Sequence, residues 1–382
     1  MEVYFDNSAT TRPYDEVIDE MARAMKNFYG NPSSLHSIGV SCDKQLTDAR
    51  EFIASTINST KEEIFFTSGA SESNNLFLKG LTKPGNHIII SKFEHPSILK
   101  TAQYLEENGI EVTYLDVDIN WQIDLNQLKD SIKKNTVLVS VMFVNNEVGS
   151  VQDLEKIGHI IKENSQRAKF HVDAVQGYGK LPIDVKRCSI DLMSTSAHKL
   201  HGPKGIGFCY IRRGINPVPL VHGGGQEKGL RSGTSNVPSV LAMKKAVEIT
   251  MSNLEANYKK VEELKEYFIK QLEGINDIRI NSPVGDKFTP YILNVSFRGV
   301  RSEVLLHMLE EYGIFVSTGS ACSSKSTKGS HVLMSIGLTD KEVDSALRFS
   351  FCDMNTKEEV DYTVDKLKKS LMFLRRIKKW MN

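Results

Sequence analysis

The chain has 382 residues, of which 40% are hydrophobic and 25% are charged, and its formal net charge is +1. The length suits a large core divided between two domains, and the composition is that of an ordinary globular protein. A net charge near zero gives no electrostatic basis for binding nucleic acid or a membrane surface, and no apolar run approaches the roughly 20 residues of a membrane span. The N-terminus lacks the basic and apolar regions of a signal peptide, so we expect a cytoplasmic protein.

Strands and helices alternate between about residues 60 and 215. The predicted strands are 63–67, 87–91, 111–115, 136–144, two segments that end near residues 176 and 195, and 205–211. The predicted helices are 73–79, 97–108, 124–133 and 153–164. The segment 136–144 is almost continuously apolar, as expected of a central parallel strand that is buried on both faces. This alternation predicts an α/β fold with a doubly wound, mostly parallel sheet, in which ligands bind at the carboxyl ends of the strands.

The C-terminal part of the chain has a different pattern. It predicts one long helical segment over 239–274, strands at 292–297, 313–317 and 346–351, and helices at 302–312 and 357–379. These elements indicate a smaller α+β domain. We place the large domain at residues 16–259 and form the small domain from 1–15 and 260–382, with the first fifteen residues packing near the active site rather than in the main sheet.

Two strand ends carry the residues that pyridoxal phosphate (PLP) requires. Lys199 follows the strand-like run that ends near residue 195, and Asp173 lies at the end of the preceding strand. A lysine amine forms an imine with the cofactor aldehyde, and a carboxylate keeps the pyridine nitrogen protonated so that the ring withdraws electrons. Taken singly, the lysine is also compatible with a surface side chain and the aspartate with a helix cap.

The five cysteines are widely spaced and form no CxxC pair, so neither a disulfide framework nor a metal site is predicted. Cys188 and Cys209 lie in or beside apolar runs and are expected to be buried. Cys322 differs, because small and polar residues surround it and Lys325 is close in sequence. Exposure and a nearby cation favour the reactive thiolate.

The chain resembles the cysteine desulfurases, PLP enzymes of fold type I with the class V aminotransferase fold, over essentially its full length. The stretches that carry the resemblance are 4–11, 30–34, 67–75, 94–97, 144–149, 171–176, 196–205, 223–227, 231–236, 320–324 and 348–350. Each is weak alone, but all of them in this order leave little room for chance. The Ser-Ala-Cys-Ser-Ser form of 320–324, in a long loop, is similar to the group that serves iron–sulfur cluster assembly.

The resemblance implies a PLP site. Lys199 is the residue that bonds to the cofactor and moves protons, Asp173 faces the pyridine nitrogen, Gln176 binds the phenolic oxygen, and His95 stacks on the ring. The implied phosphate-binding residues are Ala70, Ser71, Ser196 and His198, together with Thr234 from the other subunit of a homodimer. Backbone N–H groups at a helix N-terminus favour a phosphate, which is the physical reason for the positions of Ala70 and Ser71.

The resemblance also implies the reaction. Asn146, Arg348 and Asn31 hold the carboxylate of L-cysteine, since arginine offers a bidentate fork. Cys322, on a loop of the small domain, takes the substrate sulfur as a persulfide while L-alanine leaves. The sulfur then passes to an acceptor such as an iron–sulfur scaffold protein or a tRNA-thiolating enzyme. Two alternatives stay open: a structural ion pair for Arg348 and an incidental surface thiol for Cys322.

The chain departs from its relatives at Cys352, where they usually have glycine. At this position we favour a buried cysteine with no role in the reaction over a second thiol near the substrate.

Two other functions are considered: a PLP lyase of the same fold, acting on selenocysteine or cystine without need of Cys322, and a non-catalytic scaffold that keeps the PLP fold. The intact set of Lys199, Asp173, His95 and Cys322 argues against the scaffold.

Overall fold

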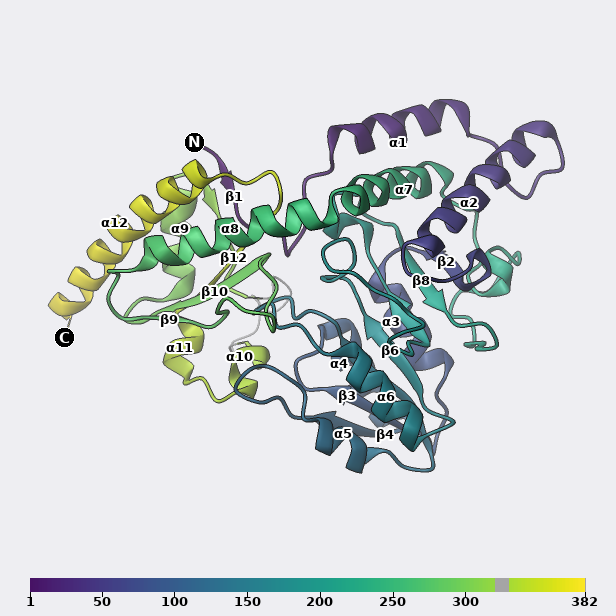
Figure 1. The fold of residues 1–382 in the computed structure, drawn as a ribbon, viewed down its shortest axis with the longest axis horizontal. Coiled ribbons are helices and arrows are strands. Elements are labelled where there is room, and N and C mark those ends of the chain that lie inside the picture. The colour runs from purple at the N-terminus through teal and green to yellow at the C-terminus, as the bar shows by residue number, and fades with distance from the viewer. Residues whose placement is uncertain (320–329, 382) are drawn as a thin grey trace.

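The computed structural model describes residues 1–319 and 330–376, and the backbone of the last helix to residue 381. Within these residues, the larger part is built on a seven-stranded sheet in the order β2-β8-β7-β6-β5-β3-β4 (Figure 1). Its strands are β2 (Ile64–Thr67), β3 (His87–Ser91), β4 (Glu111–Leu115), β5 (Thr136–Met142), β6 (Lys169–Asp173), β7 (Leu192–Ser194) and β8 (Gly207–Ile211). Strands β3 to β7 pair in parallel, and β8 is antiparallel to both β7 and β2. The predicted α/β class with a mostly parallel sheet is confirmed.

Helices cover both faces of this sheet. They are α1 (Asp15–Asn27), α2 (Ser37–Ser55), α3 (Ala70–Gly80), α4 (Pro96–Glu107), α5 (Leu125–Ser131), α6 (Leu154–Asn164) and α7 (Val237–Ser252). Successive side chains of a strand point to opposite faces, and β3 shows the consequence. Ile88 and Ile90 pack in a cluster with α3 and α4, whereas Ile89 packs in the cluster that contains α2, α6 and α7. The apolar strand residues therefore serve two helical layers.

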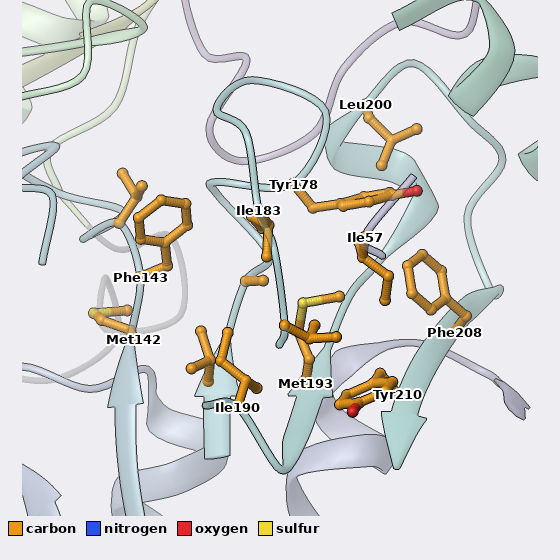
Figure 2. Close-up of a cluster of buried hydrophobic side chains, with 14 of the residues drawn as sticks. Ile57, Met142, Phe143, Tyr178, Ile183, Ile190, Met193, Leu200, Phe208 and Tyr210 are labelled. Carbon is orange, nitrogen blue, oxygen red and sulfur yellow. The ribbon is translucent and has the colours of Figure 1, made fainter. Parts of the chain in front are cut away.

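A large apolar cluster extends along β7 and β8 and past the carboxyl end of β5 (Figure 2). Met142, Tyr178, Met193 and Phe208 come together there from strands and loops that are distant in sequence. The rings of Tyr178 and Phe208 meet edge to face, with centroids 5.0 Å apart. This cluster fixes the chain immediately before and after the strand ends that carry the polar residues of the site.

A second unit lies beside the sheet, at the other end of the molecule in Figure 1. Its three-stranded antiparallel sheet has the order β12-β10-β9, and β1 pairs with β11 in a separate parallel pair. Its elements are β1 (Val3–Tyr4), α8 (Leu254–Leu272), β9 (Ile278–Ile280), β10 (Ile292–Phe297), α9 (Ser302–Glu310), β11 (Ile314–Phe315), α10 (His331–Ser335), α11 (Asp340–Asp344), β12 (Ala346–Ser350) and α12 (Lys357–Met381). The apolar side chains of β1, β10 and β12 pack against α8, α9 and α12. No helix in the described part of the chain is both long and apolar enough to span a bilayer.

The single helix predicted over 239–274 is wrong, because the structure breaks it into α7 and α8 at Asn253. Asn253 has φ −115° and ψ 13°, outside the helical region, and its side-chain amide donates to the carbonyl of Ile249 at 2.9 Å. Asparagine competes for backbone hydrogen bonds in this way and favours helix ends. The break lets α8 cross from the large sheet to the second unit (Figure 1).

The first residues of the chain join distant parts of the molecule. Val3 pairs with Ile314, and Asp6 forms an isolated bridge with Ser350 at the end of β12. The carbonyls of Ser8 and Ala9 then accept hydrogen bonds from the amine of Lys199. The prediction that this segment lies near the active site and outside the main sheet is confirmed. The domain boundaries at residues 16–259 stay a prediction.

The core of the second unit depends on one aromatic ring. Phe268 of α8 is fully buried and contacts the rings of Phe5, Phe349 and Phe351, with centroids 4.9 to 6.0 Å away. We predict that Phe268→Ala lowers the free energy of unfolding by about 3–5 kcal/mol, because the cavity is lined by stiff rings that cannot collapse. Denaturant unfolding of this variant beside Phe373→Ala, whose side chain is 56% exposed, measures the effect. Equal losses in both variants would contradict the packing argument.

Candidate active site

The carboxyl ends of the parallel strands bring the predicted site residues together. Asp173 ends β6 and pairs with Ser194, which ends β7. A 3₁₀ turn (Ala197–Lys199) follows β7 almost at once and presents Lys199 at the same edge. Strand β2 runs in the same sense as β7, since both are antiparallel to β8, so α3 begins at this edge as well.

A cavity of about 580 Å³ lies at this edge. Ten of the predicted site residues line it: Ala70, Ser71, His95, Asn146, Asp173, Gln176, Ser196, His198, Lys199 and Arg348. The volume falls in the range of pockets that bury a small organic cofactor.

The amine of Lys199 is poised as a nucleophile. It donates to the carbonyl oxygens of Ser8 and Ala9, the second at 2.8 Å. Burial, together with the nearby guanidinium of Arg348 and ammonium of Lys180, lowers the pKa of Lys199 to about 7. A lysine must lose its proton to attack a carbonyl carbon, so this environment favours bond formation with an aldehyde at neutral pH.

The carboxylate of Asp173 is fixed by two donors. Its Oδ2 accepts from the amide of Asn74 at 2.9 Å, and its Oδ1 accepts from the backbone N–H of Val175 at 3.1 Å. The same Asn74 amide donates its other hydrogen to the hydroxyl of Ser97 at 2.9 Å. One side chain of α3 therefore connects the aspartate with the start of α4.

His95 lies at the other end of this network. It is the N-cap of α4, before Pro96, and its Nδ1 accepts the backbone N–H of Ser97 at 3.1 Å. Nδ1 therefore carries no hydrogen in the neutral ring, and the proton is on Nε2. Burial lowers the pKa of His95, while the charge of Asp173 acts in the opposite direction.

The N-terminus of α3 forms one end of the cavity. Gly69 precedes the helix with φ 139°, a conformation that strongly favours glycine, and a Cβ there would lie 3.2 Å from the hydroxyl of Ser196. The free backbone N–H groups of the first turn include those of Ala70 and Ser71. His198 is close by, and burial lowers its pKa to about 4, so the imidazole is neutral. Helix dipole, N–H groups and hydroxyls together suit a phosphate.

Arg348 reaches the opposite side of the cavity from β12. Its side chain is 2% exposed, and it donates to the carbonyl of Asn146 at 2.7 Å and to the carboxylate of Asp6 at 2.8 Å. Its buried Nε has no partner among the described residues. The guanidinium thus combines a structural ion pair with a donor that is still available inside the cavity wall.

Among the described residues, two predicted site residues are not part of this cavity. Asn31 is exposed, with its side chain accepting from the N–H of Ser33, and Thr234 lies in a separate pocket with Ser68 and Arg231. Cys322 lies outside the described residues. Ser330, after the undescribed segment, donates to the carboxylate of Glu147 at 2.5 Å, and Gly319, before it, lies so close that an added Cβ would be 3.2 Å from the same carboxylate.

Sequence reasoning gave no role to Glu94, Asn74 or Ser97, although each falls in a stretch used for the resemblance. Glu94 is fully buried beneath the site and accepts from the hydroxyl of Ser91 and the N–H of Met142. Its Oε2 has no partner in the part of the chain that is described. Burial, reinforced by the charge of Asp173, raises the pKa of Glu94 to about 8. The available sequence signal was adjacency to His95.

Comparison with known proteins identifies the family of the chain. The aminotransferase class-V family matches residues 3–363. The chain belongs to the cysteine desulfurases of this family. It is 44% identical to the cysteine desulfurase IscS of Clostridium botulinum over 374 residues, covering 96% of this chain and 94% of that protein. A solved NifS-like protein superimposes with a TM-score of 0.92 at 40% identity, over 98% of this chain and all of that one. The structure of SspA in complex with cysteine has a TM-score of 0.81 at 36% identity. The match covers 93% of this chain and 100% of that one.

Members of this family use PLP, and the cavity of this desulfurase has the donors that PLP needs. A nucleophilic amine, a fixed carboxylate, a helix N-terminus and a neutral imidazole all face one cavity. The buried hydroxyl of Ser8, which has no partner among the described residues, adds a donor at the same place. The prediction of PLP as the cofactor is therefore confirmed by the family.

The buried carboxyl of Glu94 gives a pH prediction. Its pKa is about 8 in the folded protein against 4.5 for the free group, so the folded state alone keeps this proton between those values. The contribution of the Glu94 carboxyl to the free energy of unfolding therefore falls as pH rises from 5 to 8. The fall is at most about 1.4 kcal/mol for each pH unit. The isosteric change Glu94→Gln removes this titration. We expect the unfolding free energy of the variant, relative to the unchanged protein, to rise over that interval.

Denaturant unfolding of both proteins at pH 5, 6, 7 and 8 measures the difference. Other groups that titrate in this range are common to both chains and cancel in the subtraction. A difference that stays constant with pH would show that Glu94 is ionised in the folded protein.

Proposed function

We propose that this enzyme transfers the sulfur of L-cysteine to Cys322 and releases L-alanine. The observation that carries the proposal is the convergence, in one cavity, of the amine of Lys199, the fixed carboxylate of Asp173 and the guanidinium of Arg348. The reaction balances without an oxidant. The substrate C–S bond breaks and a sulfur–sulfur bond forms on Cys322, while the electron pair of the C–S bond stays with carbon. Of the two thiol protons, one ends on the methyl group of alanine and the other on the persulfide.

When bound, PLP supplies an electron sink for the charge released at the substrate Cα. Lys199 is proposed to bond to the cofactor at rest and to move the proton at Cα once substrate displaces it. Its lowered pKa supports this role, since a base that works at neutral pH must titrate near it. Asp173, held by Asn74 and Val175, would keep a proton on the ring nitrogen, and Gln176 would bind the phenolic oxygen.

His95 is proposed to stack on the cofactor ring and to move a second proton. The hydrogen-bond chain from Asp173 through Asn74 and Ser97 fixes its ring and leaves the proton on Nε2. A neutral imidazole with a defined tautomer can donate that hydrogen and take it back. The phosphate would lie at Ala70 and Ser71, with Ser196 and His198.

The substrate carboxylate is proposed to bind Arg348 and Asn146. The unpartnered Nε–H of Arg348 supports this role, because a buried donor without an acceptor is costly unless a ligand satisfies it. Asp6 already occupies one side of the guanidinium, which would hold the fork in position for the substrate. Asn31 does not line the cavity of its own chain, so its proposed contact with the substrate carboxylate would be made in the cavity of the partner subunit.

We further propose a homodimer in which Thr234 binds the phosphate in the partner subunit. Thr234 lies outside the cavity of its own chain, which agrees with a role across an interface. Large exposed apolar side chains of α1, α2 and the turn between them offer such a surface: Ile18, Met25, Tyr29, Leu35, Ile38 and Val40.

The sulfur acceptor would be an iron–sulfur scaffold protein or a tRNA-thiolating enzyme, in the cytoplasm.

The function is tested by alanine and sulfide release from L-cysteine in the presence of a reducing thiol. We predict matched amounts of the two products from the unchanged enzyme, and loss of both in Cys322→Ala, which lacks the sulfur acceptor. The absorbance of bound cofactor in both proteins controls for cofactor content. Undiminished activity in the variant would assign the enzyme to the lyases, and no product from either protein would contradict desulfuration of cysteine.

The role of Arg348 is separable from its ion pair. We predict that Arg348→Lys raises the KM for L-cysteine roughly 10- to 100-fold, because a charge-assisted hydrogen bond is lost and lysine has no bidentate fork. Asp6→Asn removes the same ion pair but keeps the guanidinium. Steady-state kinetics and thermal unfolding of both variants separate the two effects. Similar losses of stability with an unchanged KM would make Arg348 a structural residue.

A further inference from the structure

A second group of reactive side chains lies directly behind Lys199. His201 follows the lysine by two residues, and Cys352 and Asp353 follow the end of β12. One ligand atom from each of these three residues lies within 4.8 Å of the others. His201 and Cys352 are 5% and 6% exposed. This cluster takes no part in the proposed reaction.

The ring of His201 has a fixed orientation. Its Nδ1 lies 2.8 Å from the carbonyl oxygen of Arg12, which can only accept, so Nδ1 carries the hydrogen. Burial lowers the pKa of His201, and in the neutral ring Nε2 therefore has a free lone pair. Nε2 faces the carboxylate of Asp353 at 3.5 Å. A histidine that donates from one nitrogen to a backbone carbonyl and presents the other is the usual arrangement of a metal ligand.

The backbone and ring of His201 are held just as firmly. Its φ is 62°, uncommon for a residue with a side chain, and its N–H donates to the hydroxyl of Thr11 at 2.7 Å. The ring of Tyr14 stacks on the imidazole with centroids 4.3 Å apart. The hydrogen bond of Nδ1 to Arg12 and the stacking of Tyr14 on the ring leave Nε2 little freedom to turn away from Cys352 and Asp353.

Cys352 and Asp353 are also oriented toward the shared space. The N–H of Cys352 donates to Asn355 at 2.9 Å, and the hydroxyl of Tyr14 donates to the carboxylate of Asp353 at 3.0 Å. Burial raises the pKa of the Cys352 thiol to about 12, against the effect of the backbone N–H of Met354. Asp353 is 23% exposed at its side chain and gives the cluster a route to solvent.

The space between these residues is small and its charge is mixed. A cavity of about 10 Å³ is lined by all three, and also by Lys180, Tyr291 and Lys199. That volume is near the limit for one water molecule or one small ion. The ammonium of Lys180 opposes a cation, whereas a thiolate and a carboxylate together bring two negative charges.

We propose that Nε2 of His201, Sγ of Cys352 and the carboxylate of Asp353 bind one divalent ion of the zinc class. One nitrogen, one sulfur and one oxygen ligand exclude magnesium and calcium and suit Zn²⁺ with water in the fourth position. Tetrahedral bonds place ligand atoms roughly 3.6 Å apart, so side-chain shifts of about 1 Å complete the site. The thiol proton leaves to solvent when the ion binds.

This site was missed in the sequence because its ligands do not have the short spacing of a metal motif. His201 and Cys352 come together only because β12 ends beside the turn that carries Lys199. A bound ion would therefore cross-link that turn to the strand that carries Arg348. We expect it to stabilise the folded protein in proportion to its occupancy.

Binding of Co²⁺ tests the proposal in the cofactor-loaded enzyme, after treatment with a chelator. Tetrahedral Co²⁺ with a thiolate ligand has intense ligand-field bands at longer wavelengths than the absorption of the cofactor. We expect these bands to saturate at one ion per chain, to remain in Cys322→Ala, and to be absent in Cys352→Ser and His201→Gln. Competition with a coloured chelator then compares Zn²⁺ affinity, and the loss in both variants should exceed the roughly 10- to 100-fold typical of a changed outer-shell residue.

Asp353→Asn removes the carboxylate ligand at the exposed edge of the cluster and should also weaken Co²⁺ binding. Cofactor absorbance shows that each variant is folded. Bands that persist in folded Cys352→Ser, bands lost only in Cys322→Ala, or no binding by the unchanged enzyme would each overturn the proposal. Because every readout is metal binding, the result is independent of the sulfur-transfer assay.

Discussion

The parallel pairing of β6 with β7 is the constraint on which the site depends. It brings the ends of these strands to one edge, so that Asp173 and the turn with Lys199 face a single cavity although they are separated in sequence. Strand β5, which pairs with β6, continues into the loop with Asn146, and β3 continues toward His95. A one-residue slip of either pairing would turn Asp173 to the opposite face of the sheet. The apolar residues of the two helical layers prevent such a slip and so position the chemistry.

The cavity combines few charges with many neutral polar groups. Burial raises the pKa of Glu94 to about 8 and lowers the pKa values of His171 and His198 to about 3 and 4. These three groups are therefore uncharged at neutral pH, although all are titratable. The charged side chains that line the cavity are Glu72, Asp173, Lys199, Lys204 and Arg348. In a region of low dielectric, Asp173 and Arg348 act strongly on a bound molecule. These neutral groups add no charge to the region around the carboxylate of Asp173 and the guanidinium of Arg348.

Much of this organisation was predictable from local sequence. The strands up to β8, the buried Cys188 and Cys209, and the pairing of Lys199 with Asp173 at one edge follow from patterns that span a few residues at a time, whereas the other cavity residues follow from the family resemblance. Such patterns could not predict the pairing of Arg348 with Asp6, which lie 342 positions apart. They also failed at Asn253, where one polar side chain ended a pattern that otherwise continues as a helix. Asn31 and Thr234 lie outside the cavity of this single chain, and a sequence pattern does not say which copy of the chain a residue serves.

The N-terminal segment explains why these distant parts work as one unit. Asp6 pairs with Arg348 of the second unit, and the carbonyls of Ser8 and Ala9 hold the amine of Lys199 in the first. His201 is tied to the same segment through the hydroxyl of Thr11 and the carbonyl of Arg12. A molecule that displaces the amine of Lys199 must release these two carbonyls, which costs free energy unless new donors replace it. Occupation of the cavity is therefore coupled to the position of the segment, and through Asp6 to the guanidinium on the other side.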